Sequence, residues 1–83
     1  MSAALLEFDN GCSVVQFEIT PQNTRRFFNF MFIHQNEITE IEFTDVSHRS
    51  LIENAVQIEL ICVNDEKRAR QLTQLLYDKL TTT

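Results

Sequence analysis

The residue types that most often carry out chemistry are few in this chain, which has two histidines and two cysteines among 83 residues. His34 falls at the end of a predicted helix and His48 in a predicted turn, and neither has the neighbours of a catalytic triad or a metal site. Cys12 and Cys62 also lack metal-type spacing, and neither lies at a helix N-terminus that would lower the thiol pKa. We therefore expect no catalytic residue, no metal and no cofactor, and a protein that is not an enzyme.

Length and composition restrict the class of protein further. The length allows one domain, residues 1–83, and a 43% hydrophobic content with seven Phe, one Gly and one Pro excludes a disordered tail. No stretch approaches the ~20 apolar residues of a membrane span, and no secretory signal is evident. A net charge of −5 argues against direct binding to the phosphates of a nucleic acid. We expect a soluble, cytoplasmic protein with no membrane or nucleic-acid partner.

The first predicted pair of elements is a β-hairpin turning at Asn10-Gly11. Asn-Gly supplies the two positive-φ positions of a two-residue type I′ turn, and this turn sets Leu6 opposite Val15. Both strands then agree on which face is apolar, as a half-buried antiparallel pair requires. The register puts Leu6, Phe8, Val15 and Phe17 on one face, and Leu5, Glu7, Val14, Gln16 and Glu18 on the other.

A helix is predicted from Pro21 to about Gln35. Thr20 is a suitable N-cap, and Pro21 at the first helical position loses no hydrogen bond. The apolar arc of this helix spans about 200°, which is wider than one sheet contact needs. Its members are Phe27, Phe28, Phe30, Met31, Phe32 and His34, while Ile33 lies among polar residues.

The pattern then returns to period two, which predicts a second strand pair. Ser47–Ser50 has the composition of a turn between the strands Ile38–Val46 and Leu51–Val63. One register pairs Val46 with Leu51, and the alternative is a longer loop with a strand that starts at Ala55. Both readings stay open at this point.

A closing helix follows, and with it the fold class. Asn64 or Asp65 is the N-cap, and a buried stripe of Ala69, Leu72, Leu76 and Leu80 marks its face. The order ββαββα predicts an α+β two-layer sandwich, a ferredoxin-like fold with the last strand moved to the N-terminus. Two helices cover one face of the four-stranded, antiparallel-rich sheet, in which the strand after Ser50 lies between Ser13–Thr20 and Ile38–Val46. We place Cys12 and Cys62 at opposite ends of neighbouring parallel strands, about 25 Å apart, as two free thiols.

Within this class, the stretch from Val14 to Leu80 resembles the ACT-type regulatory domains, including the small subunits of acetolactate synthases. The similarity lies in the strand Val14–Ile19, the Pro-started helix, the strand pair, the Gln57–Leu60 segment and the amphipathic closing helix. The resemblance implies a regulatory or assembly role and an amino-acid ligand near Thr20–Asn23. ACT domains usually have a Gly in that loop, whereas here the loop has none.

The charged residues predict an acidic open face on the sheet. By strand parity this face carries Glu7, Glu18, Glu40, Glu42 and Glu59, and the plain alternative to a binding role is a solvated exterior. The face has neither the aromatic residues nor the positive field of an RNA-recognition sheet. Apolar residues in excess of a small core, on the first helix and on this face, favour burial against another chain.

The main hypothesis is therefore a small non-enzymatic interaction module that acts by docking, as a homodimer or against a basic protein surface. The rival hypotheses are an ACT-type subunit that senses an amino acid, and an acidic inhibitor or decoy of a nucleic-acid-binding protein. The residues expected to carry docking are the apolar Val14, Phe30, Ile33 and Ile61 and the acidic Glu18, Glu40, Glu42 and Glu59.

Overall fold

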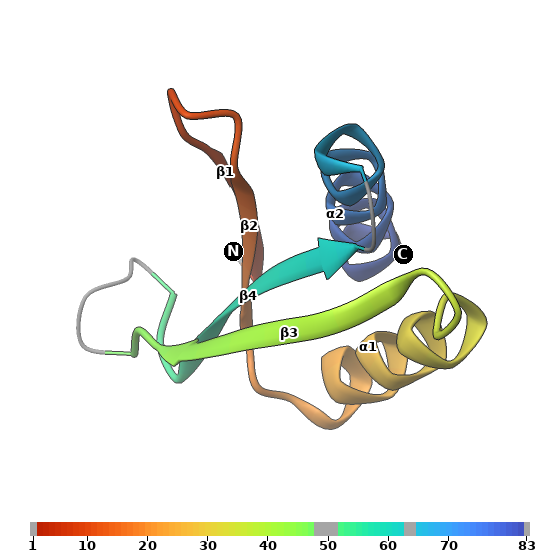
Figure 1. Cartoon of the computed structure of the whole chain (residues 1–83). Helices are drawn as coiled ribbons and strands as arrows, with labels where there is room; N and C mark the ends of the chain where they lie inside the picture. The colour runs from red at the N-terminus through yellow and green to blue at the C-terminus, as the bar shows by residue number, and fades with distance from the viewer. Residues whose placement is uncertain (1, 48–51, 63–64, 83) are drawn as a thin grey trace.

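Four strands and two helices follow the predicted order in a computed structural model that describes residues 2–47, 52–62 and 65–82 (Figure 1). They are β1 (Ala3–Glu7), β2 (Ser13–Glu18), α1 (Pro21–Ile33), β3 (Ile38–Asp45), β4 (Ala55–Cys62) and α2 (Glu66–Thr81). Among the residues that carried sequence predictions, His48, Arg49, Leu51, Val63 and Asn64 lie outside the described ranges.

The strands form one sheet in the order β1-β2-β4-β3, with every neighbouring pair antiparallel. The predicted α+β class, strand order and ferredoxin-like arrangement are confirmed. The prediction that β2 and β4 run parallel is wrong, because β4 pairs antiparallel with both β2 and β3. The beginning of β2, next to Cys12, therefore meets the end of β4 at Cys62, and the wide separation predicted for these two positions is wrong as well. Cys12 is a free thiol.

The hairpin turn is one residue longer than predicted. Phe8 N donates to Cys12 O at 2.8 Å and Gly11 N donates to Phe8 O at 3.0 Å, while Gly11 alone in the turn has a positive φ, of 86°. This is the three-residue loop in which a glycine in the left-handed region forms a bulge. Asn10 contributes its side chain instead, since its Oδ1 accepts a hydrogen bond from Cys12 N.

The extra loop residue shifts the hairpin register by one, so that Leu5 lies opposite Val15 and Glu7 opposite Ser13. A shift of one residue turns every side chain of a strand to the other face. Leu5 therefore packs against the core, and Glu7 leaves the open face on which it was predicted. Leu6, predicted to be buried, is exposed.

One core lies between the sheet and both helices, on the same face of the sheet. It joins alternate residues of the strands to Phe27 and Phe30 of α1 and to one stripe of α2. Burial of an aliphatic side chain of this kind contributes about 1.5–3 kcal/mol. The most completely buried members are Val15, Phe30, Ile58, Leu72, Leu76 and Leu80.

A second, smaller cluster covers one end of the opposite face. Val46 and Ile52, from either side of the connection between β3 and β4, pack with Ala55 and against Ala4. The start of β4 at Ala55 confirms the longer loop, and the register Ile41–Leu60 replaces the one that paired Val46 with Leu51. Asn54, with a φ of 51°, immediately precedes the strand.

Local capping explains where both helices begin. Thr20 Oγ1 accepts from Asn23 N at 3.1 Å, with Pro21 in the first turn, and Asp65 Oδ1 accepts from Lys67 N at 3.0 Å. The first helix ends at Ile33, two residues before the predicted end. Within the described ranges, neither helix is long and apolar enough to cross a membrane.

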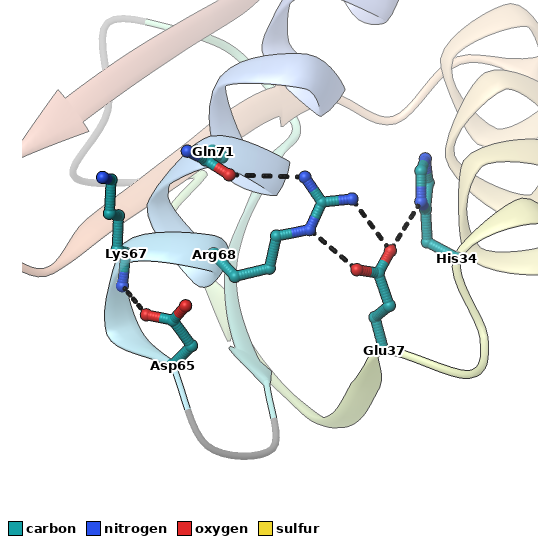
Figure 2. Close-up of polar contacts among 6 residues, drawn as sticks. All are labelled: His34, Glu37, Asp65, Lys67, Arg68 and Gln71. Carbon is teal, nitrogen blue, oxygen red and sulfur yellow. Dashed lines mark hydrogen bonds and ion pairs between the residues drawn. The ribbon is translucent and has the colours of Figure 1, made fainter.

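A polar clasp joins the loop after α1 to the first turns of α2 (Figure 2). Arg68 donates from Nε and Nη2 to the two oxygens of Glu37, at 2.7 and 3.0 Å. His34 Nδ1 lies 3.3 Å from the same carboxylate. Together these contacts hold the pKa of Glu37 below its ordinary value, with the Arg68 hydrogen bonds as the largest cause. The clasp fixes the point at which the chain leaves α1 and enters β3.

Candidate functional site

The acidic residues of the open face gather on its β3–β4 side. Glu42 of β3 pairs directly with Glu59 of β4, and Glu40 lies opposite Ile61. Directly opposed residues on one face have Cβ atoms about 4.5–5.5 Å apart, so these carboxylates are close neighbours. Glu18, on β2, shares the face but lies toward the start of β4. Three of the four predicted acidic residues therefore form one group, which we call the acidic cluster (Glu40, Glu42 and Glu59).

Contact with its acidic neighbours shifts the pKa of Glu42. A hydrogen bond with Glu59, followed by the charges of Glu59 and Glu40, raises the pKa of Glu42 above its ordinary value. Cys12 Sγ donates a hydrogen bond to Glu59. Partial burial, together with Glu59, raises the pKa of the Cys12 thiol to about 11. The thiol is therefore protonated at neutral pH and is a poor nucleophile.

Two of the predicted apolar contact residues do not reach the surface. Phe30 is 1% exposed and Val14 is 3% exposed, so neither offers area to a partner, and their prediction as contact residues is wrong. Phe30 faces the core because it lies on the same side of α1 as the buried Phe27. Ile61 is half-buried on the open face, and Ile33 is exposed on α1 instead. The predicted set is thus not one surface.

A group of exposed phenylalanines occupies the outer side of α1 and the neighbouring edge of the sheet. Phe28, Phe32 and Phe43 are 64%, 74% and 60% exposed. The buried ring of Phe27 links two of them, with centroids 5.7 Å from Phe28 and 5.9 Å from Phe43. Phe32 follows Phe28 by one helical turn, which places the two on one side of the helix. We call Phe28, Phe32 and Phe43 the phenylalanine patch.

The wide apolar arc of α1 predicted more apolar side chains than the core can hold. It did not show which of these side chains would be buried. Asn23 settles the orientation: it is 4% exposed, and its Nδ2 donates to Glu18 O at 2.9 Å. A polar residue thus lies on the core side of α1, so the core takes Phe27 and Phe30 and leaves Phe28 and Phe32 outside. In the sequence, the i, i+4 spacing of Phe28 and Phe32 was the signal that could have identified these two rings as one surface. Phe43 was not predicted as a contact residue.

The two edge strands of the sheet differ in how much of them is covered. β3 has six exposed residues out of eight. β1 has two exposed residues out of five, and its Ala3 and Leu5 pack into the core that α2 shares. In Figure 1, β3 runs as a long strand along one side of the sheet, with α1 next to it. The outer edge of β3 is therefore the most exposed strand surface among the described residues.

A cleft of ≈550 Å³ lies between the hairpin loop and α2. Its lining includes Glu59 and Cys12, together with polar groups that bond within the chain. Arg70 Nη1 donates to Gly11 O at 3.2 Å. Among the residues that the structure describes, no group of three or more His, Cys, Asp or Glu side chains is arranged to hold a metal ion. The one thiol in this lining, Cys12, contacts the Glu59 carboxylate, but this contact raises the thiol pKa and does not activate it, so the geometry favours no particular reaction.

Comparison of the chain with family models, with curated proteins and with solved structures finds no significant match.

Proposed function

We propose that this chain is a small non-enzymatic docking module that acts as a homodimer, with the contact centred on the phenylalanine patch. The observation that carries the proposal is the exposure of three large aromatic rings at one place on the surface. The largest apolar patch on a protein surface is often functional, and aromatic rings dominate the energy of protein contacts.

Charge favours a second copy of the chain as the occupant. The chain carries a net −5, so two copies repel one another over most of their surfaces. Among the described helices and strands, α1 alone has no Asp or Glu, and it carries Arg25 and Arg26. Phe28 and Phe32 therefore lie on an element without negative charge, whereas Phe43 lies on β3 next to Glu42. A two-fold contact would place the same patch on both partners.

The area of the patch predicts a weak dimer. A phenylalanine buries about 150–250 Å², so three rings exposed by roughly two thirds supply about 400 Å² per copy. Stable interfaces need about 800 Å² per partner, which leaves half of the contact to the surroundings of the patch. A dissociation constant in the micromolar range is expected.

Sedimentation equilibrium tests the dimer with one matched pair of variants. Phe32→Asp would bury a charge in the contact and should weaken association at least about tenfold. Phe8→Asp places the same charge on another exposed phenylalanine, in the hairpin loop, and should leave association unchanged. A wild-type chain that stays monomeric well above micromolar concentration would contradict the proposal, and so would equal effects of the two variants.

The ACT resemblance gives a second, untested reading, in which an amino acid binds near Thr20–Asn23. Two polar groups of this loop already bond within the chain, since Thr20 Oγ1 accepts from Asn23 N and Asn23 Nδ2 donates to Glu18 O. No feature of the described residues favours this reading over docking.

A further inference from the structure

The outer edge of β3 has few of the features that usually block a sheet edge. Edges are commonly protected by short strands, by charged side chains and above all lysine, by proline or by a bulge. β3 is eight residues long and contains neither proline nor lysine. Its one irregularity lies near its start, between Ile38 and Glu40. From Glu40 to Asp45 the strand is regular, and within the described ranges no further strand pairs with its outer side.

The side chains along this edge alternate between two kinds. Glu40 and Glu42 point to the open face, where Glu59 lies beside them. Ile41 and Phe43 point to the helix-covered face, and Phe43 is 60% exposed there. A strand added beside β3 would therefore meet carboxylates on one face and apolar groups on the other.

A second copy of β3 fits this edge poorly. Strands paired around a two-fold axis keep their faces, so Glu40 and Glu42 of both copies would share one face next to Glu59. Like charges on neighbouring strands destabilise their pairing. The glutamates thus act against self-pairing of the edge, while they attract a cationic strand.

We infer that the β3 edge binds an extended segment of a partner protein in which basic residues alternate with apolar ones, adding it to the sheet as a fifth strand. The main-chain groups of β3 would pair with those of the segment, as in other cases of strand addition. Basic side chains would reach Glu40 and Glu42, and the apolar ones would pack against Ile41 and Phe43. This partner is distinct from the second copy proposed above, although both contacts include Phe43.

The electrostatics of the acidic cluster support a cationic occupant. A hydrogen bond with Glu59, the negative charges of Glu59 and Glu40, and desolvation all raise the pKa of the Glu42 carboxyl. The ionised form is therefore under repulsion in the free chain, and a neighbouring cation would relieve it.

The test is a fluorescence-anisotropy titration of the chain with a capped, labelled peptide that has the length of β3 and alternates lysine with valine. We expect saturable binding with one peptide per chain, weaker as salt is added. The double variant Glu40→Gln/Glu42→Gln should bind about tenfold more weakly at low salt. The control Glu7→Gln/Glu53→Gln removes the same charge from exposed sites off this edge and should bind like the wild type.

A second peptide separates strand addition from simple charge attraction. The same sequence, N-methylated at the residues whose amides would face β3, keeps its charge but cannot pair with the edge. Loss of its binding supports the proposal. Equal binding of the two peptides overturns the proposal, as does equal binding to the two double variants or no binding at all. Phe32→Asp should keep the peptide affinity, so a failed dimer and a failed peptide site give different results.

Discussion

The two helices of this small sandwich bury their apolar residues to very different extents. α2 places Leu72, Leu76 and Leu80 fully in the core, at 0–2% exposure. α1 also buries Phe27 and Phe30 in the core. It leaves other large apolar side chains on the surface, including the patch residues Phe28 and Phe32.

The neighbouring edge strands show the same difference, since β1 shares the core with α2 while β3 is mostly exposed. The half of the molecule built from β1 and α2 therefore buries most of its apolar side chains, although Leu6 and Leu75 stay partly exposed. The half built from α1 and β3 carries apolar surface and an open strand edge that the fold of one chain does not use. This contrast shows that hydrophobic content alone does not identify a core, and it places the candidate binding surfaces on one half.

The largest effect is expected from truncating one apolar residue of each helix, a buried one on α2 and an exposed one on α1. Leu76→Ala should lower the free energy of unfolding by about 2–5 kcal/mol, because it leaves a cavity in the core. Phe28→Ala, at a mostly exposed position, should change it by no more than about 0.5 kcal/mol. Urea unfolding followed by circular dichroism, at a concentration below dimerisation, measures both. Comparable losses would show that α1 is packed as fully as α2 and would remove the contrast.

A smaller effect is expected in the hairpin that belongs to the half built from β1 and α2. Gly11→Ala forces a residue with a Cβ into the left-handed region and should cost about 1–2 kcal/mol. The added Cβ would lie 3.3 Å from Arg70 Nη1, a flexible side-chain end that is able to move aside. Asp9→Ala, in the same loop but without a positive φ, should be close to neutral in the same unfolding measurement. If Gly11→Ala is also neutral, the turn does not require the left-handed conformation.

The smallest effects come from two carboxyls whose pKa values shift in opposite directions. The pKa of Glu37 is lowered, so its contribution is present above the ordinary value of 4.5 and is lost as the pH falls through the folded-state value. The pKa of Glu42 is raised, so the folded chain is relatively more stable at low pH and loses that advantage as the pH rises through the raised value.

At neutral pH, therefore, Glu37→Gln should destabilise the chain slightly, while Glu42→Gln should stabilise it slightly. Both differences from the wild type should fade in acid, where all the carboxyls are protonated. Thermal unfolding at a series of pH values gives the comparison. A destabilising Glu42→Gln at neutral pH would show that the acidic cluster is not under repulsion.

Features set by local sequence were predictable from the sequence. Thr20-Pro21 and Asp65 cap their helices because capping depends on residues only two or three positions apart. Apolar periodicity identified all six elements, and the connection rules for strands and helices gave the sheet order.

Features set by distant contacts were not predictable. Asn-Gly suits a two-residue turn, but a three-residue loop also accepts Gly11. The burial of Ala3 and Leu5 in the core decides between these two turns. The register of β3 on β4 likewise depends on how Val46 and Ile52 pack, not on their local sequence.

The candidate site was predicted in part for the same reason. The acidic cluster follows from alternation along two strands, which the sequence displays directly. The phenylalanine patch depends on how α1 is rotated about its axis against the sheet. The buried Asn23 fixes this rotation, but from the sequence alone an asparagine is expected on the surface.

The small cluster of Val46, Ile52 and Ala55 has a consequence for the reach of the acidic face. Ala4 of β1 packs against this cluster, and the small side chains of Ala4 and Ala55 leave room there for Val46 and Ile52. The uncovered part of the open face therefore lies on the side of Glu40 and Glu59. A larger side chain at Ala55 would displace Val46 and Ile52 and expose more of the open face beside Glu18.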